Sequence, residues 1–126
     1  MDWPDYFPKN CPPQNARRDN LTVYRLVDND PPCQNDFIPN KLLYPHINYT
    51  GETLCLVCGI SVDKTLEGIK RTRKRFRVLR NKKIAVGTLK PNDGFILETG
   101  GGTHVTWWVQ TKTPHISFKV VNEDAK

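Results

Sequence analysis

The stretch that decides the fold is residues 84–109, which read IAVGTLKPNDGFILETGGGTHVTWWV. It contains three short runs of apolar, β-branched and aromatic residues, and such runs are typical of strands. PNDG at 91–94 is a β-turn signal, and the glycines at 100–102 give a flexible connection. Strands that follow one another so closely are expected to be antiparallel neighbours. The predicted strands are 84–89, 94–98 and 103–109.

Two more strands and a helix are predicted upstream, and a last strand downstream. LTVYRLV at 21–27 shows strand alternation, and LCLVCGISV at 54–62 is apolar on both faces, which predicts a central strand. Asp63 is a good N-cap for a helix that ends near 77–81. The last strand is predicted at 116–121. The apolar residues at helical spacing, which should be buried, are Leu66, Ile69 and Phe76.

Length and composition place these elements in a single small domain. A chain of 126 residues is within the usual size of one domain. We expect an α+β fold with a mixed or mainly antiparallel sheet of about five to six strands and one main basic helix packed on it. Prolines in the first 20 residues disfavour helix and central strand there. The predicted divisions are an extended Pro-rich arm at 1–20, the domain at 21–121 and a frayed tail at 122–126.

The sequence shows no signal for a membrane or for export. No apolar run reaches the ~18 residues of a transmembrane helix, and the first residues lack the basic and apolar regions of a secretory signal. We therefore expect a cytoplasmic protein with no membrane partner, and the oligomeric state is left open. Its four cysteines, Cys11, Cys33, Cys55 and Cys58, are expected to be reduced.

Positive charge is concentrated in one segment. The chain has a net charge of +6, yet residues 70–83 hold nine basic residues and no acidic one, and the rest of the chain carries a net charge of −3. This asymmetry predicts a surface that binds nucleic-acid phosphate, without evident sequence readout, or an acidic protein surface. A solvated helix face is the structural alternative. The predicted polyanion-binding residues are Lys70, Arg71, Arg73, Lys74, Arg75, Arg77, Arg80, Lys82 and Lys83.

Strand alternation separates the two neighbouring tryptophans. His104 and Trp108 share one face of the predicted strand 103–109, and Trp107 lies on the other. If one indole faces outward, it offers a stacking platform for a base or a sugar, so Trp107 and Trp108 are candidate stacking residues. The high average burial of Trp favours the alternative, in which both are covered. Val105 should be more buried than His104.

An enzyme is the alternative function. Arg25 in the first strand, Ser61 just before the helix and Glu98 ahead of the glycines resemble the arginine–serine–glutamate layout of ADP-ribosyltransferase-like folds. The resemblance implies that the arginine holds cofactor phosphates and that the glutamate orients a ribose. The family's Ser-Thr-Ser triplet is absent from the chain. With His104, these three are the candidate catalytic residues for a nucleotide-like ligand, whereas the binding protein needs no cofactor.

A structural zinc protein is the third possibility. Cys55 and Cys58 form one CxxC, which is half of the usual paired pattern. Side chains three residues apart in a strand point to opposite faces, so chelation would need a tight turn at Gly59. We therefore expect no metal and buried, unbridged cysteines. Cys58 should face the core beside the apolar residues Leu54, Leu56, Ile60 and Val62.

Overall fold

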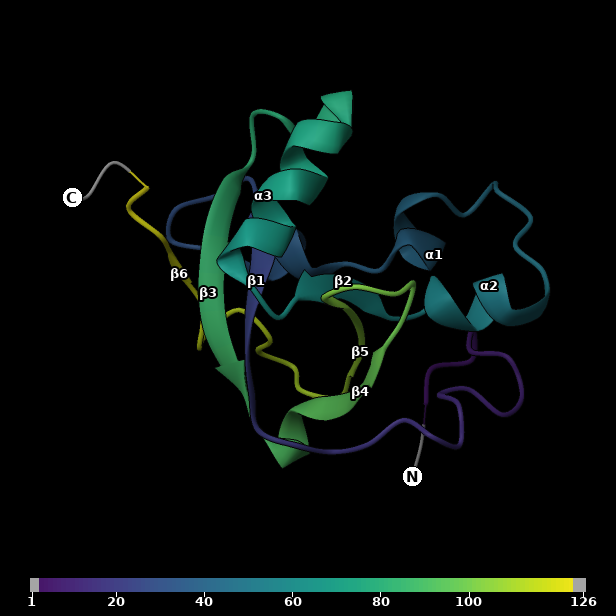
Figure 1. Cartoon of the computed structure of the whole chain (residues 1–126). Coiled ribbons are helices and arrows are strands. Elements are labelled where there is room, and N and C mark those ends of the chain that lie inside the picture. Colours follow the sequence, from purple (N-terminus) through teal and green to yellow (C-terminus); the bar gives the residue numbers. More distant parts are fainter. Residues whose placement is uncertain (1–2, 124–126) are drawn as a thin grey trace.

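One six-stranded antiparallel sheet organises residues 3–123, the part of the chain that the computed structural model describes (Figure 1). The strand order is β4-β5-β2-β1-β3-β6, and the domain is small and of the α+β class, as predicted. None of the helices within the described residues combines the length and the apolar character that crossing a membrane requires. The strands are β1 Leu21–Val27, β2 Ile60–Asp63, β3 Lys83–Leu89, β4 Gly94–Glu98, β5 His104–Val109 and β6 Lys119–Val120. The helices are α1 Asn40–Leu43, α2 Gly51–Leu56 and α3 Leu66–Arg75, with 3-10 helices η1 Gln34–Phe37, η2 Arg77–Leu79 and η3 Pro91–Asp93.

Side-chain alternation gives the sheet two covered faces. α3 contacts β1 and β2 (Figure 1). The first face buries the main core, which consists of Val23, Val27, Phe37, Ile60, Val62, Ala85, Leu89, Ile96, Val105, Trp107 and Phe118. A second cluster buries Cys11, Cys58 and Trp108, with Trp3, Tyr6, Phe7, Ala16, Cys55, Phe95 and Leu97 packed around them.

Both tryptophans of β5 are buried, each in a different cluster. Trp107 is 1% exposed, and its Nε1 donates to the carbonyl oxygen of Asp93 at 3.0 Å. Trp108 is 0% exposed, and its Nε1 donates to the carbonyl oxygen of Cys55 at 2.9 Å. Neither indole can stack on a ligand at the surface, so Trp107 and Trp108 are excluded as stacking residues, and the favoured alternative, in which both are covered, is confirmed. The reason is that both faces of β5 are covered.

α3 begins at a capped N-terminus two residues later than predicted. Thr65, not Asp63, is the N-cap, because its hydroxyl accepts a hydrogen bond from the Gly68 N–H at 2.9 Å. The Asp63 carboxylate is buried and accepts from the Thr65 N–H at 3.0 Å. Gly68 lies so close to Asp63 and Thr103 that a Cβ would collide with both side chains. The missing side chain therefore permits the close approach of α3 to β2.

α3 ends at Arg75, one residue before Phe76, the last apolar residue at helical spacing. Phe76 is extended, with φ −110° and ψ 119°. Ile69 is buried as predicted, and Leu66 is half-buried, but Phe76 is 49% exposed. The predicted burial of Phe76 is wrong because the chain has left the helix at that point, so the helical period no longer places its side chain on the sheet.

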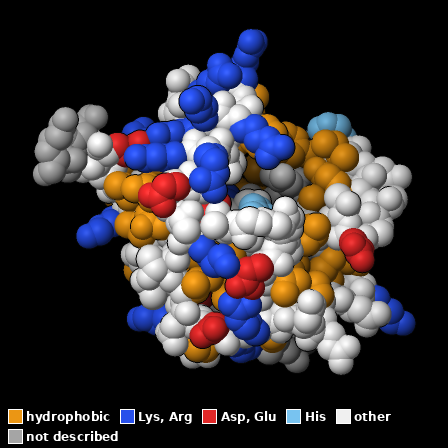
Figure 2. All heavy atoms as spheres, in the orientation of Figure 1, with side chains coloured by type: hydrophobic (Ala, Val, Ile, Leu, Met, Phe, Trp, Pro, Cys, Tyr) orange, Lys and Arg blue, Asp and Glu red, His pale blue; other side chains and the backbone are white. Residues whose placement is uncertain are grey.

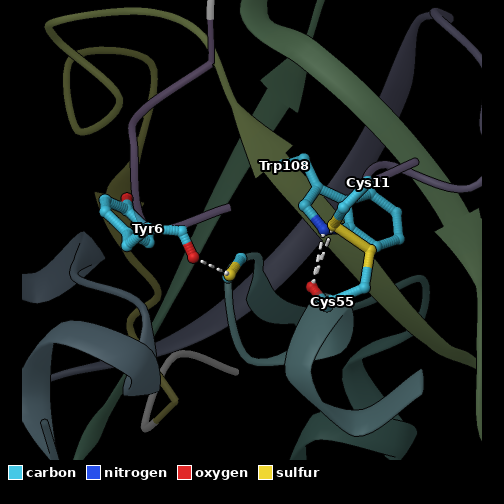
Figure 3. Close-up of a disulfide and its surroundings, with 5 residues drawn as sticks. Tyr6, Cys11, Cys55 and Trp108 are labelled. Carbon is cyan, nitrogen blue, oxygen red and sulfur yellow. Dashed lines mark hydrogen bonds between the residues drawn. A yellow bond between two sulfur atoms is a disulfide. The ribbon is translucent and has the colours of Figure 1, made fainter. Parts of the chain in front are cut away.

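The predicted central strand at 54–62 is correct only in its last three residues, 60–62. Residues 51–56 form α2, and β2 then runs from Ile60 to Asp63 between β5 and β1. A buried apolar run has no period that separates helix from strand. Distant contacts hold α2 in place, since Cys55 is bonded to Cys11 and its carbonyl accepts from Trp108 (Figure 3).

The last strand is shorter than the predicted 116–121. β6 consists of Lys119–Val120, and the residues before it form a turn in which the Phe118 N–H donates to the His115 carbonyl at 3.0 Å. This turn directs Phe118 into the core against Gly87, where a Cβ would lie 2.7 Å from the ring. Of the predicted tail, residues 124–126 lie outside the described residues.

The N-terminal residues run along the edge of β4. The backbone of Arg17 pairs with that of Ile96 through hydrogen bonds of 2.9 and 2.8 Å. Trp3 stacks on Phe7, with the ring centroids 4.9 Å apart. Cys11 then joins this segment covalently to Cys55 of α2 (Figure 3). These contacts close one side of the second cluster.

The disulfide corrects the prediction that all four cysteines are reduced. Cys11 and Cys55 are bonded across a sequence separation of 44 residues, while Cys33 and Cys58 are free. The CxxC motif did not predict this bond, because only Cys55 of the motif is in the disulfide and its partner, Cys11, lies outside the motif. With Cys55 in a disulfide, no Cys55 thiolate remains for zinc, and the weak candidacy of Cys55 and Cys58 as metal ligands is not supported.

Cys58 is buried and unbridged as predicted, but on the other side of the sheet. It packs with Trp108, and its thiol donates to the Tyr6 carbonyl at 3.7 Å. Burial raises the pKa of this thiol. The prediction that it lies beside Ile60 and Val62 is wrong, because these two side chains belong to the first cluster. The turn between α2 and β2 separates Cys58 from the alternation of the strand.

Trp108→Ala is expected to lower the free energy of unfolding by about 3–5 kcal/mol, the usual result of truncating a buried aromatic side chain. Val78→Ala is the matched control, since Val78 is 85% exposed and its loss should change stability by less than about 0.5 kcal/mol. Urea unfolding measures both. Equal, small effects would contradict the burial of Trp108.

Reduction of the disulfide is expected to lower the free energy of unfolding by about 2–4 kcal/mol, because a closed loop of this length restricts the unfolded chain. Urea unfolding with and without dithiothreitol measures the loss. The Cys11→Ala/Cys55→Ala double variant should be as unstable as the reduced protein and insensitive to the reductant. Four titratable thiols in the denatured, unreduced protein would contradict the Cys11–Cys55 bond.

Candidate polyanion-binding surface

Lys and Arg side chains gather over the part of the molecule that α3 and the following turn form (Figures 1 and 2). Residues three or four apart in a helix lie on the same side, and this spacing brings several of the cations together. They surround a depression of about 350 Å³. Its lining residues are Lys70, Arg73, Lys74, Arg80 and Glu123. The depression therefore unites four of the nine predicted polyanion-binding residues.

An ion pair between Arg73 and Glu123 closes one side of the depression. The two guanidinium nitrogens of Arg73 donate to the two carboxylate oxygens of Glu123 at 2.8 and 2.5 Å, and Arg73 also donates to the Lys82 carbonyl at 3.1 Å. Arg73 lowers the pKa of Glu123 through these bonds, and Glu123 raises the pKa of Arg73. A phosphate would accept the same paired donors, so Glu123 occupies a position that an anionic ligand could take.

The other cations fall into two groups. Lys82 and Lys83 are directed to the end of β1: the Lys82 ammonium donates to the Asp28 carboxylate at 2.9 Å, and Lys83 donates to the Asp28 carbonyl at 3.2 Å. Six others form no ion pair with any acidic residue between residues 3 and 123. These six are Lys70, Arg71, Lys74, Arg75, Arg77 and Arg80, and all are exposed.

Helix electrostatics offset part of the repulsion among these charges. Arg73, Lys74 and Arg75 lie in the last turn of α3, where the helix dipole favours cations by about 0.3–1 kcal/mol each. Like charges four residues apart cost a few tenths of a kcal/mol per pair. Arg77 and Arg80 follow the helix and gain little from its dipole. At Arg77 and Arg80 the positive charge of the surface is therefore offset neither by the helix dipole nor by an ion pair with residues 3–123.

Arg25 lies on the core face of β1 and is held by the backbone. Its Nε donates to the Asp36 carbonyl at 2.9 Å and its Nη1 to the Ser61 carbonyl at 2.7 Å. Its guanidinium lies 5.5 Å from the Phe37 ring centroid. Burial lowers its pKa to about 10. With two donors committed to carbonyls, Arg25 is a structural cross-link between β1, η1 and β2, and its geometry does not support a role in holding cofactor phosphates.

The remaining enzyme candidates are not assembled around Arg25. Ser61 pairs with Thr106 across β2 and β5, on the face opposite to the Arg25 side chain. His104 lies on the same face as Ser61; its Nδ1 is 2.9 Å from the Thr99 hydroxyl, and it is half-buried whereas Val105 is fully buried, as predicted.

Glu98 is engaged in ion pairs at the end of β4. The Arg17 guanidinium donates to its two carboxylate oxygens at 2.6 and 3.1 Å, and the Lys64 ammonium lies 3.6 Å away. Arg17 lowers the pKa of Glu98 to about 2. The structure therefore gives Glu98 a role in fixing the N-terminal segment, and it does not bring Arg25, Ser61, Glu98 and His104 into one site.

Within the described ranges, no group of three or more His, Cys, Asp or Glu side chains could hold a metal ion. Comparison with protein-family models, curated proteins and solved structures finds no match for this chain. The candidate surface therefore rests on its own residues.

Two residues of this surface were missed by the sequence analysis. Glu123 is 50 residues from Arg73, and only the pairing of β6 with β3 brings the C-terminal segment near α3. Phe76 was assigned to the core because its spacing from Ile69 matches two helical turns. The extended conformation of Phe76 has no clear signal in the sequence.

Glu98→Gln is expected to destabilise the protein at pH 7 by up to about 1 kcal/mol, the range for exposed ion pairs. A carboxylate with a lowered pKa contributes stability above its unfolded value near 4.5 and loses it as the pH falls towards about 2. The difference between wild type and variant should therefore shrink between pH 5 and pH 2, as measured by urea unfolding. Glu52→Gln is the control, and an equal pH effect there would contradict the role of Arg17.

Proposed function

We propose that the surface formed by α3, η2 and the start of β3 binds polyanions, and above all the phosphate backbone of nucleic acid. The observation that carries the proposal is the depression lined by Lys70, Arg73, Lys74 and Arg80, surrounded by further exposed cations. Binding would release the counterions of the phosphates and would involve no base-specific contact from these residues.

The dimensions of α3 are compatible with such a ligand. A helix of 10 residues is about 15 Å long. The phosphates of one DNA strand are spaced by about 3.4 Å along the axis, so this length matches about four of them. Three of the four cations that line the depression, Lys70, Arg73 and Lys74, lie on α3, and Arg80 follows it. An acidic protein surface is the other partner class with the required charge, and the tests below separate the two.

Contact with nucleic acid suits a cytoplasmic protein, and we retain that compartment as part of the proposal. The Cys11–Cys55 disulfide is more typical of oxidising compartments. The thiol titration described above tests the disulfide itself and is independent of the cationic surface.

A salt series tests the proposal. With about four phosphate contacts on a duplex, log K should fall against log salt with a slope of about −3.6, which weakens binding roughly 100-fold between 50 and 200 mM salt; on a single strand the slope should be about −2.8. The Lys70→Gln/Lys74→Gln/Arg80→Gln variant should flatten the slope by about 0.9 for each contact removed. The measurement is fluorescence anisotropy with labelled oligonucleotides.

Two further variants sharpen this test. Lys9→Gln/Lys90→Gln/Lys112→Gln changes the net charge by the same amount at exposed positions outside the surface and should leave the slope unchanged. Glu123→Gln should tighten binding a few-fold, because it removes the carboxylate from Arg73. Equal effects of the two triple variants would indicate bulk charge alone, and no binding at about 50 mM salt would contradict nucleic acid as the ligand.

A further inference from the structure

An exposed aromatic ring lies within the basic segment. Phe76 is 49% exposed and Val78 is 85% exposed, with Arg75 and Arg77 beside them in the chain. We propose that this surface prefers single-stranded nucleic acid, with an unpaired base stacked on Phe76 while the neighbouring cations hold the phosphates. The proposal rests on the function proposed above and specifies the class of its ligand.

The backbone around Phe76 is fixed by hydrogen bonds. The Phe76 N–H donates to the Thr72 carbonyl at 3.3 Å, and the Phe76 carbonyl accepts from the Leu79 N–H at 3.0 Å. The next turn is closed by the Arg80 N–H, which donates to the Arg77 carbonyl at 3.2 Å. These bonds fix the segment between α3 and β3, so the exposure of Phe76 follows from ordered structure, and little ordering would be required on binding.

The surroundings of Phe76 suit a nucleotide. The guanidinium carbon of Arg75 lies 5.6 Å from the Phe76 ring centroid, and Lys74 and Arg80, which line the cationic depression, flank the ring within four residues along the chain. An aromatic ring next to cations is the combination with which proteins bind single strands, since every base has a face that can stack and every nucleotide has a phosphate that a cation can contact. Residues 70–83 contain no acidic residue, and Lys74, Arg75, Arg77 and Arg80 form no ion pair with an acidic side chain of residues 3–123.

The same geometry disfavours a duplex at this ring. Base faces in a duplex are stacked on one another and are not open to a surface side chain, so a duplex could use only the cations. The tryptophans cannot replace Phe76, because both indoles of β5 are buried. Among the exposed large apolar side chains of residues 3–123, the aromatic ones are Phe76 at 49% and Tyr44 at 47% exposure. Tyr44 lies outside the basic segment and provides a matched control.

The test compares three labelled probes of about 12 nucleotides: oligothymidylate, a duplex, and an abasic strand that keeps the phosphates but has no bases. Wild type should bind oligothymidylate at least about 5-fold more tightly than the abasic strand, the lower limit for stacking of one base. Phe76→Leu, which keeps an apolar side chain without a ring, should remove this preference. It should leave duplex and abasic binding unchanged, and Tyr44→Leu should alter none of the three.

The outcomes separate this inference from the proposed function. Salt-dependent binding of all three probes with equal affinity, and no effect of Phe76→Leu, would overturn the single-strand preference and leave polyanion binding intact. No binding of any probe at about 50 mM salt would overturn both. If Phe76→Leu weakens binding to phosphatidylglycerol vesicles but not to oligothymidylate, the ring contacts lipid and the inference is wrong. Urea unfolding should show that the two leucine variants are as stable as wild type.

Discussion

The burial of two adjacent tryptophans is the constraint on which the rest of the structure depends. Alternation along β5 sends the Trp107 and Trp108 side chains to opposite faces of the sheet, so both faces need a cover. Each buried indole also needs an acceptor for its N–H, because an unpaired polar group in the interior is costly. The acceptors are the Asp93 and Cys55 carbonyls, which fix the β3–β4 connection and α2 against β5. One dipeptide thus positions elements from both halves of the chain.

Because other segments bury Trp108 on the second face of the sheet, α3 does not have to cover it, and most of the surface of α3 can carry charged side chains. The N-terminal residues and α2 enclose Trp108, and the Cys11–Cys55 disulfide secures them. α3 packs on β1 and β2 beside this cluster, and Ile69 is the only large side chain of α3 that is fully buried in the described structure. So narrow a contact is sufficient because Thr65 caps the helix and Gly68 lets it approach closely. Apart from the half-buried Leu66, Thr72 and Arg73, the remaining side chains of α3 are exposed.

The sequence predicted the regular strands well and the long-range contacts poorly. β1 and β4 have the predicted bounds, because each shows an alternating or bounded apolar run between turn residues. Residues 54–59 were wrongly predicted as strand, since they belong to α2 and the turn after it, and α2 is held there by partners far along the chain and not by its own periodicity. Phe76 was predicted to be buried because its spacing fits a helical period, but α3 ends one residue before it. In the candidate surface, the cations were identifiable from composition, whereas Glu123 and the exposed ring required the three-dimensional arrangement.

The fold itself gives no reason for most of the charge on this surface. Arg73, Lys82 and Lys83 each tie two segments together, so their contributions to the structure are visible. Cations in the last turn of α3 gain about 0.3–1 kcal/mol each from the helix dipole, which offsets part of their mutual repulsion. Arg77 and Arg80 lie beyond the helix, are exposed, and have no acidic partner within residues 3–123. They add repulsion without a compensating contact, and a polyanion held across α3 and η2 would supply the missing negative charge.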